Sequence, residues 1–244
     1  MSEIIIDIKS VSVRFNKSSE HISGLKDYVI KMLKGELMFQ EFIALKDINF
    51  QVRKGESWGI IGKNGSGKST LLKLISGIIK PHKGTISVKG TISPLIELGA
   101  GFDAELTARE NIFLNGALLG YSKKFIQENF NKIVDFAELQ DFLDTPIKNF
   151  SSGMAARLGF AIATVAKPDI LIVDEVLAVG DFAFQQKCKA KMEELLSGGT
   201  TLLFVSHSID QVKQLCKKAI WIDKSEIKAI GEVGQVANIY MNNQ

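Results

Sequence analysis

Residues 62–70 decide the fold, and they read Gly62-Lys63-Asn64-Gly65-Ser66-Gly67-Lys68-Ser69-Thr70. This stretch matches the phosphate-binding pattern G-x-x-x-x-G-K-[ST], and it lies between an apolar strand-like run and a helix-like run. Glycines let a backbone wrap closely around a phosphate, and the N–H groups at a helix start attract negative charge. Lys68 is placed to reach the β- and γ-phosphates, and the Ser69 hydroxyl to ligate Mg²⁺. The strand–loop–helix setting argues against a glycine-rich turn with a chance lysine, so all nine residues are predicted to bind a nucleoside triphosphate.

Composition limits what else the chain can be. At 244 residues it can form one large α/β domain with an inserted subdomain. A net charge of +3 is too balanced to indicate a nucleic-acid partner. The N-terminus lacks signal-peptide features, and the longest uncharged apolar run, 158–166, is far shorter than the ~20 residues that span a bilayer. We therefore expect membrane association only through a partner or a surface contact. Cys188 and Cys216 are expected to be reduced packing residues of a cytosolic protein.

Two further apolar strands end in residues that can act on a triphosphate. The run 170–173 leads into Asp174 and Glu175, and the run 200–205 leads into Ser206 and His207. The carboxyl ends of parallel strands meet at the ligand edge of a sheet. Asp174 is therefore predicted to hold Mg²⁺ beside Ser69, and Glu175 to polarise the attacking water as general base. His207 is predicted to contact the γ-phosphate, and a capped surface histidine is the alternative.

Strand and helix patterns divide the chain into a core and an insertion. Alternating strand patterns open the chain, whereas the block after residue 97 has helical character, with Thr107 and Glu110 forming a capping box at one helix start. Strand–helix alternation then resumes. The predicted division is 1–97 and 167–244 for the core with a β subdomain, 98–166 for a helical subdomain, and 16–43 for an insertion that carries an amphipathic helix.

A serine–glycine motif within the helical block points to a family. Phe150-Ser151-Ser152-Gly153-Met154 precedes a helix-like run and, taken alone, is an ordinary helix start with a serine cap. Its place upstream of the acidic strand is similar to the signature Ser-Gly-Gly-Gln of ABC transporter ATPases, which it matches in the first Ser and the second Gly. The chain resembles these ATPase subunits over essentially its whole length. The implied fold is α/β, a P-loop NTPase (RecA-like) core with an N-terminal antiparallel β subdomain and an inserted α-helical subdomain.

The resemblance implies a shared site with ATP and Mg²⁺ as cofactors. Ser151, Ser152 and Gly153 at the helix start would bind the γ-phosphate of ATP held by a second copy, so the site would be complete only in a homodimer. Asp181 matches the D-loop aspartate of the family. Phe15 matches the aromatic residue that stacks on adenine, for which a flat phenyl face is sufficient.

Several stretches narrow the resemblance to exporters of lipid-linked polysaccharides, which include O-antigen, capsule and teichoic acid exporters. These stretches are the runs 95–102, 105–112 and 176–181 and the long insertion after Phe15. The implied function is ATP hydrolysis that drives export of an O-antigen-like polymer through a separate integral membrane permease, with the chain peripheral on the cytoplasmic face of the inner membrane. Related exporter ATPases often carry an extra carbohydrate-binding domain at the C-terminus. Since the chain stops at Gln244, we expect no selection of a modified terminal sugar.

One position departs from the family pattern. No glutamine occurs between Gln51 and Gln127, so the Q-loop position falls to Glu97. A carboxylate can bind Mg²⁺ or water there, but it adds negative charge beside the phosphates. Two other classes of protein fit the sequence less well. A small-molecule kinase would not need the 151–153 motif, and a soluble ABC ATPase of repair or translation would carry two sites or a coiled-coil arm.

The insertion contains a helix-like stripe over 22–34. Its apolar positions fall at helical spacing, at Ile22, Leu25, Val29, Met32 and Leu33. The stripe can pack on its own ATPase core. Alternatively, by resemblance to polysaccharide exporters, it lies against the membrane subunit, with Lys26, Lys31 and Lys34 facing anionic headgroups or the pyrophosphate of the carrier lipid.

Overall fold

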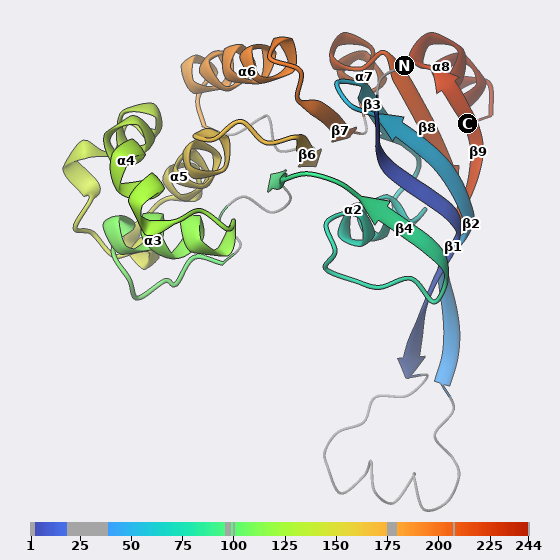
Figure 1. The fold of residues 1–244 in the computed structure, drawn as a ribbon, viewed down its shortest axis with the longest axis horizontal. Coiled ribbons are helices and arrows are strands. Elements are labelled where there is room, and N and C mark those ends of the chain that lie inside the picture. The colour runs from blue at the N-terminus through green and yellow to red at the C-terminus, as the bar shows by residue number, and fades with distance from the viewer. Residues whose placement is uncertain are drawn as a thin grey trace, which may run out of the picture.

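The computed structural model describes residues 3–18, 39–95, 99, 101–174, 180–206 and 208–243, except the side chains of 16–18 and 39–40. Two sheets with the helices that pack on them, and a separate group of helices, make up this part of the chain (Figure 1). The helix predicted over 22–34 lies outside the described residues, and so do Glu97, Glu175 and His207.

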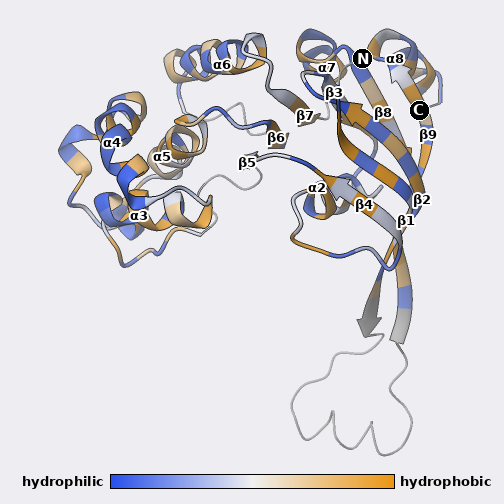
Figure 2. Cartoon of the chain, viewed as in Figure 1, coloured by the Kyte–Doolittle hydropathy of each residue, from blue (hydrophilic) through white to orange (hydrophobic). Residues whose placement is uncertain are grey.

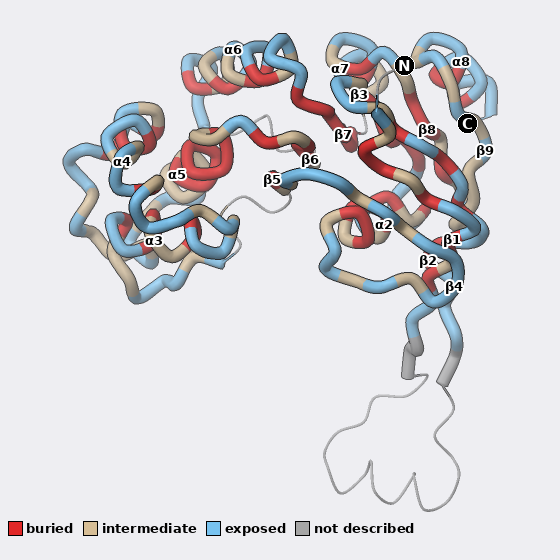
Figure 3. Tube along the Cα trace, in the orientation of Figure 1, coloured by how far each residue is buried: buried red, intermediate tan, exposed pale blue. Residues whose placement is uncertain are grey.

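The larger sheet has six strands in the order β5-β6-β7-β3-β8-β9. All neighbours are parallel except β8 and β9, which form an antiparallel hairpin. In spatial order the strands are β5 (Ile92–Leu95), β6 (Ile170–Asp174), β7 (Thr201–Val205), β3 (Ser57–Ile61), β8 (Lys218–Asp223) and β9 (Glu226–Glu232). β6 and β7 are almost continuously apolar because both their faces are covered, as the run of buried residues in Figure 3 shows. The parallel arrangement brings the carboxyl ends of β3, β6 and β7 to one edge of the sheet.

The smaller sheet is antiparallel, with strand order β2-β1-β4. Its strands are β1 (Ile4–Ser18), β2 (Phe39–Arg53) and β4 (Lys83–Val88). Buried residues of β1 and β2, among them Ile6 and Leu45, share one core with Leu71 and Leu74 of helix α2. β1 and β2 pair as far as Ser18 and Phe39, so the sheet extends into both ends of the segment predicted as an insertion.

The helical group contains α3 (Ala108–Leu118), α4 (Lys123–Ala137), η1 (Gln140–Phe142), η2 (Ile147–Asn149) and α5 (Ser152–Thr164). The predicted capping box at Thr107 and Glu110 is confirmed, with both reciprocal hydrogen bonds present. The group has its own core, which includes Ile112, Ile133 and Leu158. In Figure 2, α4 carries hydrophilic and hydrophobic residues along its length, as a helix with one buried face does.

The remaining helices pack on the parallel sheet. They are α2 (Lys68–Ile75), α6 (Phe182–Ser197), α7 (Ile209–Leu215) and α8 (Val233–Met241). The sequence pattern did not predict α7, whose seven residues are too few for a clear period. Cys188 and Cys216 are buried, as expected of packing residues, and burial raises the pKa of each thiol to about 12. Within the described ranges, no helix combines the length and apolar character needed to cross a bilayer.

Candidate functional site: a phosphate loop that opens into a cavity

The predicted phosphate loop connects β3 to α2, and its glycines are required by close backbone contacts. Gly67 has a φ of 114°, and a Cβ there would lie 2.5 Å from the carbonyl oxygen of Ala44 on β2. Gly62 has a φ of 151°, and a Cβ there would collide with the carbonyl oxygen of Ile222 on β8. Both positions exclude a side chain by conformation and by space. The loop is therefore fixed between β2 and β8.

The side chain of Lys68 folds back against the loop that precedes it. The residue is only 7% exposed, and its Nζ donates to the carbonyl oxygens of Gly62 at 2.7 Å and Lys63 at 3.0 Å. Gly67 is the N-cap residue of α2, and no side chain of the described residues caps this helix start. The first N–H groups of a helix have no partners within it, and together with the helix dipole they attract anions. A buried cation and an uncapped helix start make a phosphate site.

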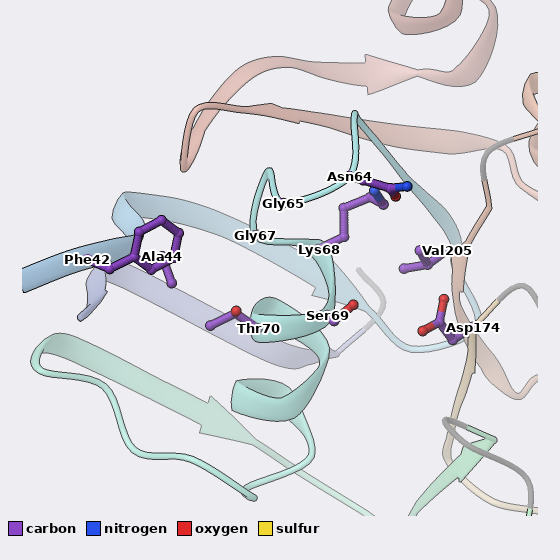
Figure 4. A pocket seen from close by; sticks show the side chains of 10 residues that line it. All are labelled: Phe42, Ala44, Asn64, Gly65, Gly67, Lys68, Ser69, Thr70, Asp174 and Val205. Carbon is purple, nitrogen blue, oxygen red and sulfur yellow. The ribbon is translucent and has the colours of Figure 1, made fainter. Parts of the chain in front are cut away.

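The loop forms one wall of a cavity of about 310 Å³ (Figure 4). Its lining comprises Phe42, Ala44, Asn64, Gly65, Gly67, Lys68, Ser69, Thr70, Asp174 and Val205. Asp174 is the last residue of β6 and pairs with Val205 of β7, so the predicted convergence of strand ends on the loop is observed. Of the predicted loop residues, Gly62, Lys63 and Ser66 are not part of this lining. The buried Ser66 Oγ has no hydrogen-bond partner among the described residues.

The donor set of the cavity fits a magnesium ion. Mg²⁺ prefers oxygen ligands and is usually bound by one or two protein groups together with substrate phosphates and water. The hydroxyl of Ser69 and the carboxylate of Asp174 line the same cavity and provide such a set. The predicted residues Glu97, Glu175 and His207 lie outside the described part of the chain. Of their described neighbours, Asp174 ends β6, Ser206 directly follows β7, and Ser208 is the N-cap residue of α7.

Ser151, Ser152 and Gly153 stand at the exposed start of α5, away from this cavity. Ser151 is the N-cap residue, and its Oγ accepts a hydrogen bond from the N–H of Met154 at 3.2 Å. Ser151 and Ser152 are exposed, and none of the three residues lines the cavity of the same chain. Figure 1 shows α5 within the helical group, whereas α2 lies beneath the small sheet.

Asp181 connects the helical group to α6. Its Oδ1 accepts a hydrogen bond from the N–H of Phe184 and caps α6, while its Oδ2 lies 2.6 Å from Nη2 of Arg157 on α5. These interactions, the Phe184 N–H bond first, hold the pKa of the Asp181 carboxyl below its usual value. Arg157 also pairs with Glu138 at 3.0 Å and lies over the Phe184 ring.

Two phenylalanines stand opposite each other near the cavity. Phe15 on β1 pairs in register with Phe42 on β2, and both are about half exposed. Phe42 lines the cavity, whereas Phe15 is not part of the described lining. The sequence predicts Phe15 at the nucleotide and does not single out Phe42, which is the phenylalanine in the lining. The signal for Phe42 lies in the strand pairing, which the local pattern of β2 does not show.

Comparisons with known proteins agree with this geometry. The family model for ABC transporters matches residues 45–178. An O-antigen export system ATP-binding protein RfbB of Klebsiella pneumoniae is 42% identical over 244 residues, which cover 98% of each chain. Another RfbB of that species is 44% identical over 224 residues, or 89% of each chain. The teichoic acids export ATP-binding protein TagH of Bacillus anthracis is 41% identical over 96% of this chain, which spans 42% of that longer protein.

Solved structures support the fold. A dimeric post-hydrolysis structure of the ATP-binding cassette MJ0796 with ADP and Pi superposes with a TM-score of 0.73 and 21% identity, covering 93% of this chain and 98% of that chain. An ATP-binding subunit of an ABC transporter gives a TM-score of 0.75 and 21% identity, covering 97% and 93%. With the cavity, the family match and these relatives in agreement, the chain belongs to the ABC transporter family as an ATP-binding, ATP-hydrolysing subunit.

Proposed function

We propose that the chain is the ATPase subunit of an exporter of a lipid-linked, O-antigen-like polysaccharide and drives a separate membrane permease. The observation that carries the ATPase assignment is the convergence of Lys68, Ser69 and Asp174 on one cavity. The export assignment rests on the names of the relatives, which are O-antigen and teichoic acid export proteins. Teichoic acid or capsule export is the nearest alternative, and a soluble non-transport ABC ATPase is a more distant one.

The phosphate loop would bind the triphosphate of ATP. Residues 62–70 would surround the β- and γ-phosphates with backbone N–H groups, and the Lys68 ammonium would replace its bonds to the Gly62 and Lys63 carbonyls by bonds to phosphate oxygens. Ser69 and Asp174 would hold Mg²⁺, with Glu97 at the neighbouring Q-loop position. The ion, when bound, neutralises charge that develops on the phosphates.

Hydrolysis would rest on two residues that follow the strand ends. Glu175 comes directly after Asp174 at the end of β6, and we assign it the role of general base for the attacking water. His207 follows Ser206 at the end of β7, and we assign it a contact to the γ-phosphate. Ser206 is buried, and its Oγ accepts a hydrogen bond from the N–H of Ser208, so the backbone on both sides of His207 is restrained.

A second copy of the chain would complete the site. Ser151 and the uncovered start of α5 present a hydroxyl and helix N–H groups that do not reach the cavity of their own chain. In a head-to-tail dimer they would bind the γ-phosphate held by the partner, with Ser152, Gly153 and Asp181 at the same interface. Dimer opening after hydrolysis would drive the permease. The chain would be peripheral on the cytoplasmic face of the inner membrane, with no nucleic-acid partner.

The test uses the substitution Glu175→Gln, which removes the base and keeps the size of the side chain. The variant should bind ATP, lose ~10²–10⁴-fold in turnover, and accumulate as an ATP-bound dimer in light scattering after size exclusion. Lys68→Ala, the control, should bind ATP weakly and stay monomeric. Wild-type turnover in Glu175→Gln would remove that residue from its role, and a monomer saturated with ATP would argue against the shared site.

The transport assignment needs its own experiment. Purification of the protein from its native membranes should recover an integral membrane subunit, and mass spectrometry should detect a lipid-linked glycan with it. Recovery of the ATPase without a membrane protein would favour the soluble alternative. A co-purified poly(glycerol phosphate) or poly(ribitol phosphate) would instead favour teichoic acid export.

A further inference from the structure

We propose that Gln211 in the first turn of α7 is a positioning residue for ATP hydrolysis, and that it acts on His207 through the hydroxyl of Ser206. The proposal rests on the γ-phosphate contact proposed above for His207, and it adds a residue that lies outside the phosphate cavity. Its starting point is that Gln211 is hydrogen-bonded to Ser206 and to Ser208, the two sequence neighbours of His207.

The chain leaves β7 at the phosphate cavity and turns into α7. Val205, the last residue of β7, lines that cavity on the same side as Asp174 (Figure 4). Ser206 follows and is only 1% exposed. Its Oγ accepts a hydrogen bond from the N–H of Ser208 at 3.0 Å, which is a turn closed by a side chain. The hydroxyl of Ser206 therefore connects the residues on either side of position 207.

The proton of this hydroxyl is donated to Gln211. Ser206 Oγ donates to Oε1 of Gln211 at 2.9 Å, and the N–H of Gln211 donates to Oγ of Ser208, the N-cap residue of α7, at 3.4 Å. A serine hydroxyl rotates to suit its partners, and it has one proton and two lone pairs. Because the proton is directed at Gln211, a lone pair is available for the N–H of Ser208. The acceptor on Gln211 thus sets the orientation of the hydroxyl that closes the turn.

A helix cap alone does not require this arrangement, as the start of α3 shows. There the capping box closes directly: the N–H of Thr107 donates to Oε2 of Glu110 at 2.8 Å, and the N–H of Glu110 donates to Oγ1 of Thr107 at 3.3 Å. Ser208 and Gln211 have the same spacing at α7. The N–H of Ser208, however, is bonded to Ser206 Oγ, which in turn donates to Gln211. The inserted hydroxyl extends the capping interaction back to the end of β7.

Gln211 itself lies on the surface. It is exposed and lines a cavity of about 170 Å³ between α6 and α7, together with Gln214 three residues further along the helix. It is not part of the described lining of the phosphate cavity. Replacing Gln211 therefore leaves that lining unchanged and removes no buried apolar group. An effect of the replacement on hydrolysis must pass through Ser206.

The test measures kcat and KM for ATP in the purified protein. Gln211→Leu keeps a side chain of similar size and removes the acceptor. Its kcat should fall about 10–100-fold, because a misplacement of about 1 Å can cost as much as about 10²-fold in rate, and KM should stay near the wild-type value. Gln211→Glu keeps an acceptor for the hydroxyl and should retain most of the activity. Gln214→Leu, the matched control in the same cavity, should change neither constant.

Double variants identify the route of the effect. If Gln211 acts through Ser206 on His207, Gln211→Leu should add nothing to the loss caused by Ser206→Ala or by His207→Ala. Losses that multiply would overturn the proposal, and so would wild-type kcat in Gln211→Leu. Equal losses in Gln211→Leu and Gln211→Glu would also overturn it, because that pattern reports general damage to α7. Wild-type kcat in His207→Ala would instead refute the role proposed for His207, and this inference with it.

Discussion

Gly67 shows how a single residue sets the position of the phosphate loop. Its backbone lies against the carbonyl oxygen of Ala44, and its φ of 114° lies in a region that side chains rarely adopt. Gly65, two residues earlier, also has a positive φ, of 76°, but a Cβ there would meet no heavy atom of the described residues within 4 Å. A side chain at Gly67 would therefore meet both backbone strain and a steric collision, whereas a side chain at Gly65 would meet backbone strain alone.

Alanine substitutions at these two glycines should differ in severity. Gly65→Ala should lower the free energy of unfolding by about 1–2 kcal/mol, which is the cost of holding a residue with a side chain in the left-handed backbone conformation. Gly67→Ala adds a collision with β2, so its free energy of unfolding should fall by about 2–4 kcal/mol and ATP binding should be lost. Urea denaturation and calorimetry would measure both quantities. Equal effects of the two substitutions would show that the contact with Ala44 does not constrain the loop.

Gly153 provides the opposite case, a glycine that its own chain does not require. A Cβ there would meet only Ser151 Oγ, at 3.8 Å, among the described atoms. Gly153→Ala should therefore preserve or raise the melting temperature, since alanine favours a helix by about 0.5–1 kcal/mol. In the proposed dimer the added methyl would obstruct the partner's phosphate, so ATPase activity should fall at least about tenfold, an effect comparable to loss of a well-placed contact.

The control for Gly153 is Gly234, which occupies the same second position of α8. A Cβ at Gly234 would meet no heavy atom within 4 Å in the described part of the chain. Gly234→Ala should raise helix stability similarly and leave ATPase activity intact. Full activity in Gly153→Ala would argue against a partner at this helix start.

These residues also mark the limit of prediction from sequence. The loop at 62–70 was predictable because its strand, turn and helix are adjacent in the chain. The acid at Asp174 was predictable because it ends a buried strand. Phe42 was not, since its position depends on the bulge at Ala44 and on a partner strand more than twenty residues away. Pairing register is a tertiary property, and no local pattern in β2 reports it.

At the scale of elements, Arg157 connects α5 to α6. Its guanidinium pairs with Glu138 and Asp181, lies 4.8 Å from the Phe184 ring centroid, and is mostly buried. The proposed partner-binding residues lie at the start of α5. The contacts of Arg157 therefore fix the orientation of this helix start relative to α6. This contact between two helices is a tertiary feature, and the residue pattern of neither helix predicts it.

Arg157→Ala should lower the free energy of unfolding by about 1–2 kcal/mol, because a packed cation–π contact and two ion pairs are lost together. Arg109 offers a matched control on α3, since it lies over Phe130 but pairs with one exposed carboxylate, Asp144. Arg109→Ala should cost less than about 1 kcal/mol. Urea denaturation would measure the free energy of unfolding of both variants. Equal losses of free energy would mean that the interactions of Arg157 contribute no more than those of a surface residue.

The hairpin β8–β9 is attached to the small sheet by charge. Glu226 accepts hydrogen bonds from Lys228 and from Lys46 on β2, each at 2.8 Å, and these lower its pKa to about 2 from 4.5. A carboxyl group whose pKa is lower in the folded state than in the unfolded state adds stability to the fold. This stability is complete above the unfolded-state pKa and is lost as the pH falls through the folded-state pKa. The contribution should therefore fade between about pH 4.5 and pH 2.

Glu226→Gln tests this dependence. The melting temperature of the variant should lie below that of the wild type above pH 5, and the two should converge as the pH approaches 2. Because the pair is exposed, 1 M salt should reduce the difference at neutral pH. A difference that stays constant from pH 7 to pH 2.5 would show that the carboxylate is not the source of the stability.

In the proposed mechanism, ATP hydrolysis requires two copies of the chain. The cavity holds the phosphate loop and Asp174, while Ser151 stands at an exposed helix start outside it. Lys68→Ala weakens ATP binding by the phosphate loop of the chain that carries it. Ser151→Arg obstructs the start of α5, which that chain would present to its partner. Each variant alone should therefore lack ATPase activity, for different reasons.

Mixing the two purified variants tests the shared site most directly. A mixed dimer combines the intact loop of the Ser151→Arg chain with the intact Ser151 of the Lys68→Ala chain and so contains one complete site. We predict that ATPase activity returns on mixing, rises with the proportion of mixed dimers, and does not return when either variant is mixed with the Lys68→Ala, Ser151→Arg double variant. Full activity of Ser151→Arg alone, or no activity at any mixing ratio while ATP binding is intact, would show that the site is not shared between two chains.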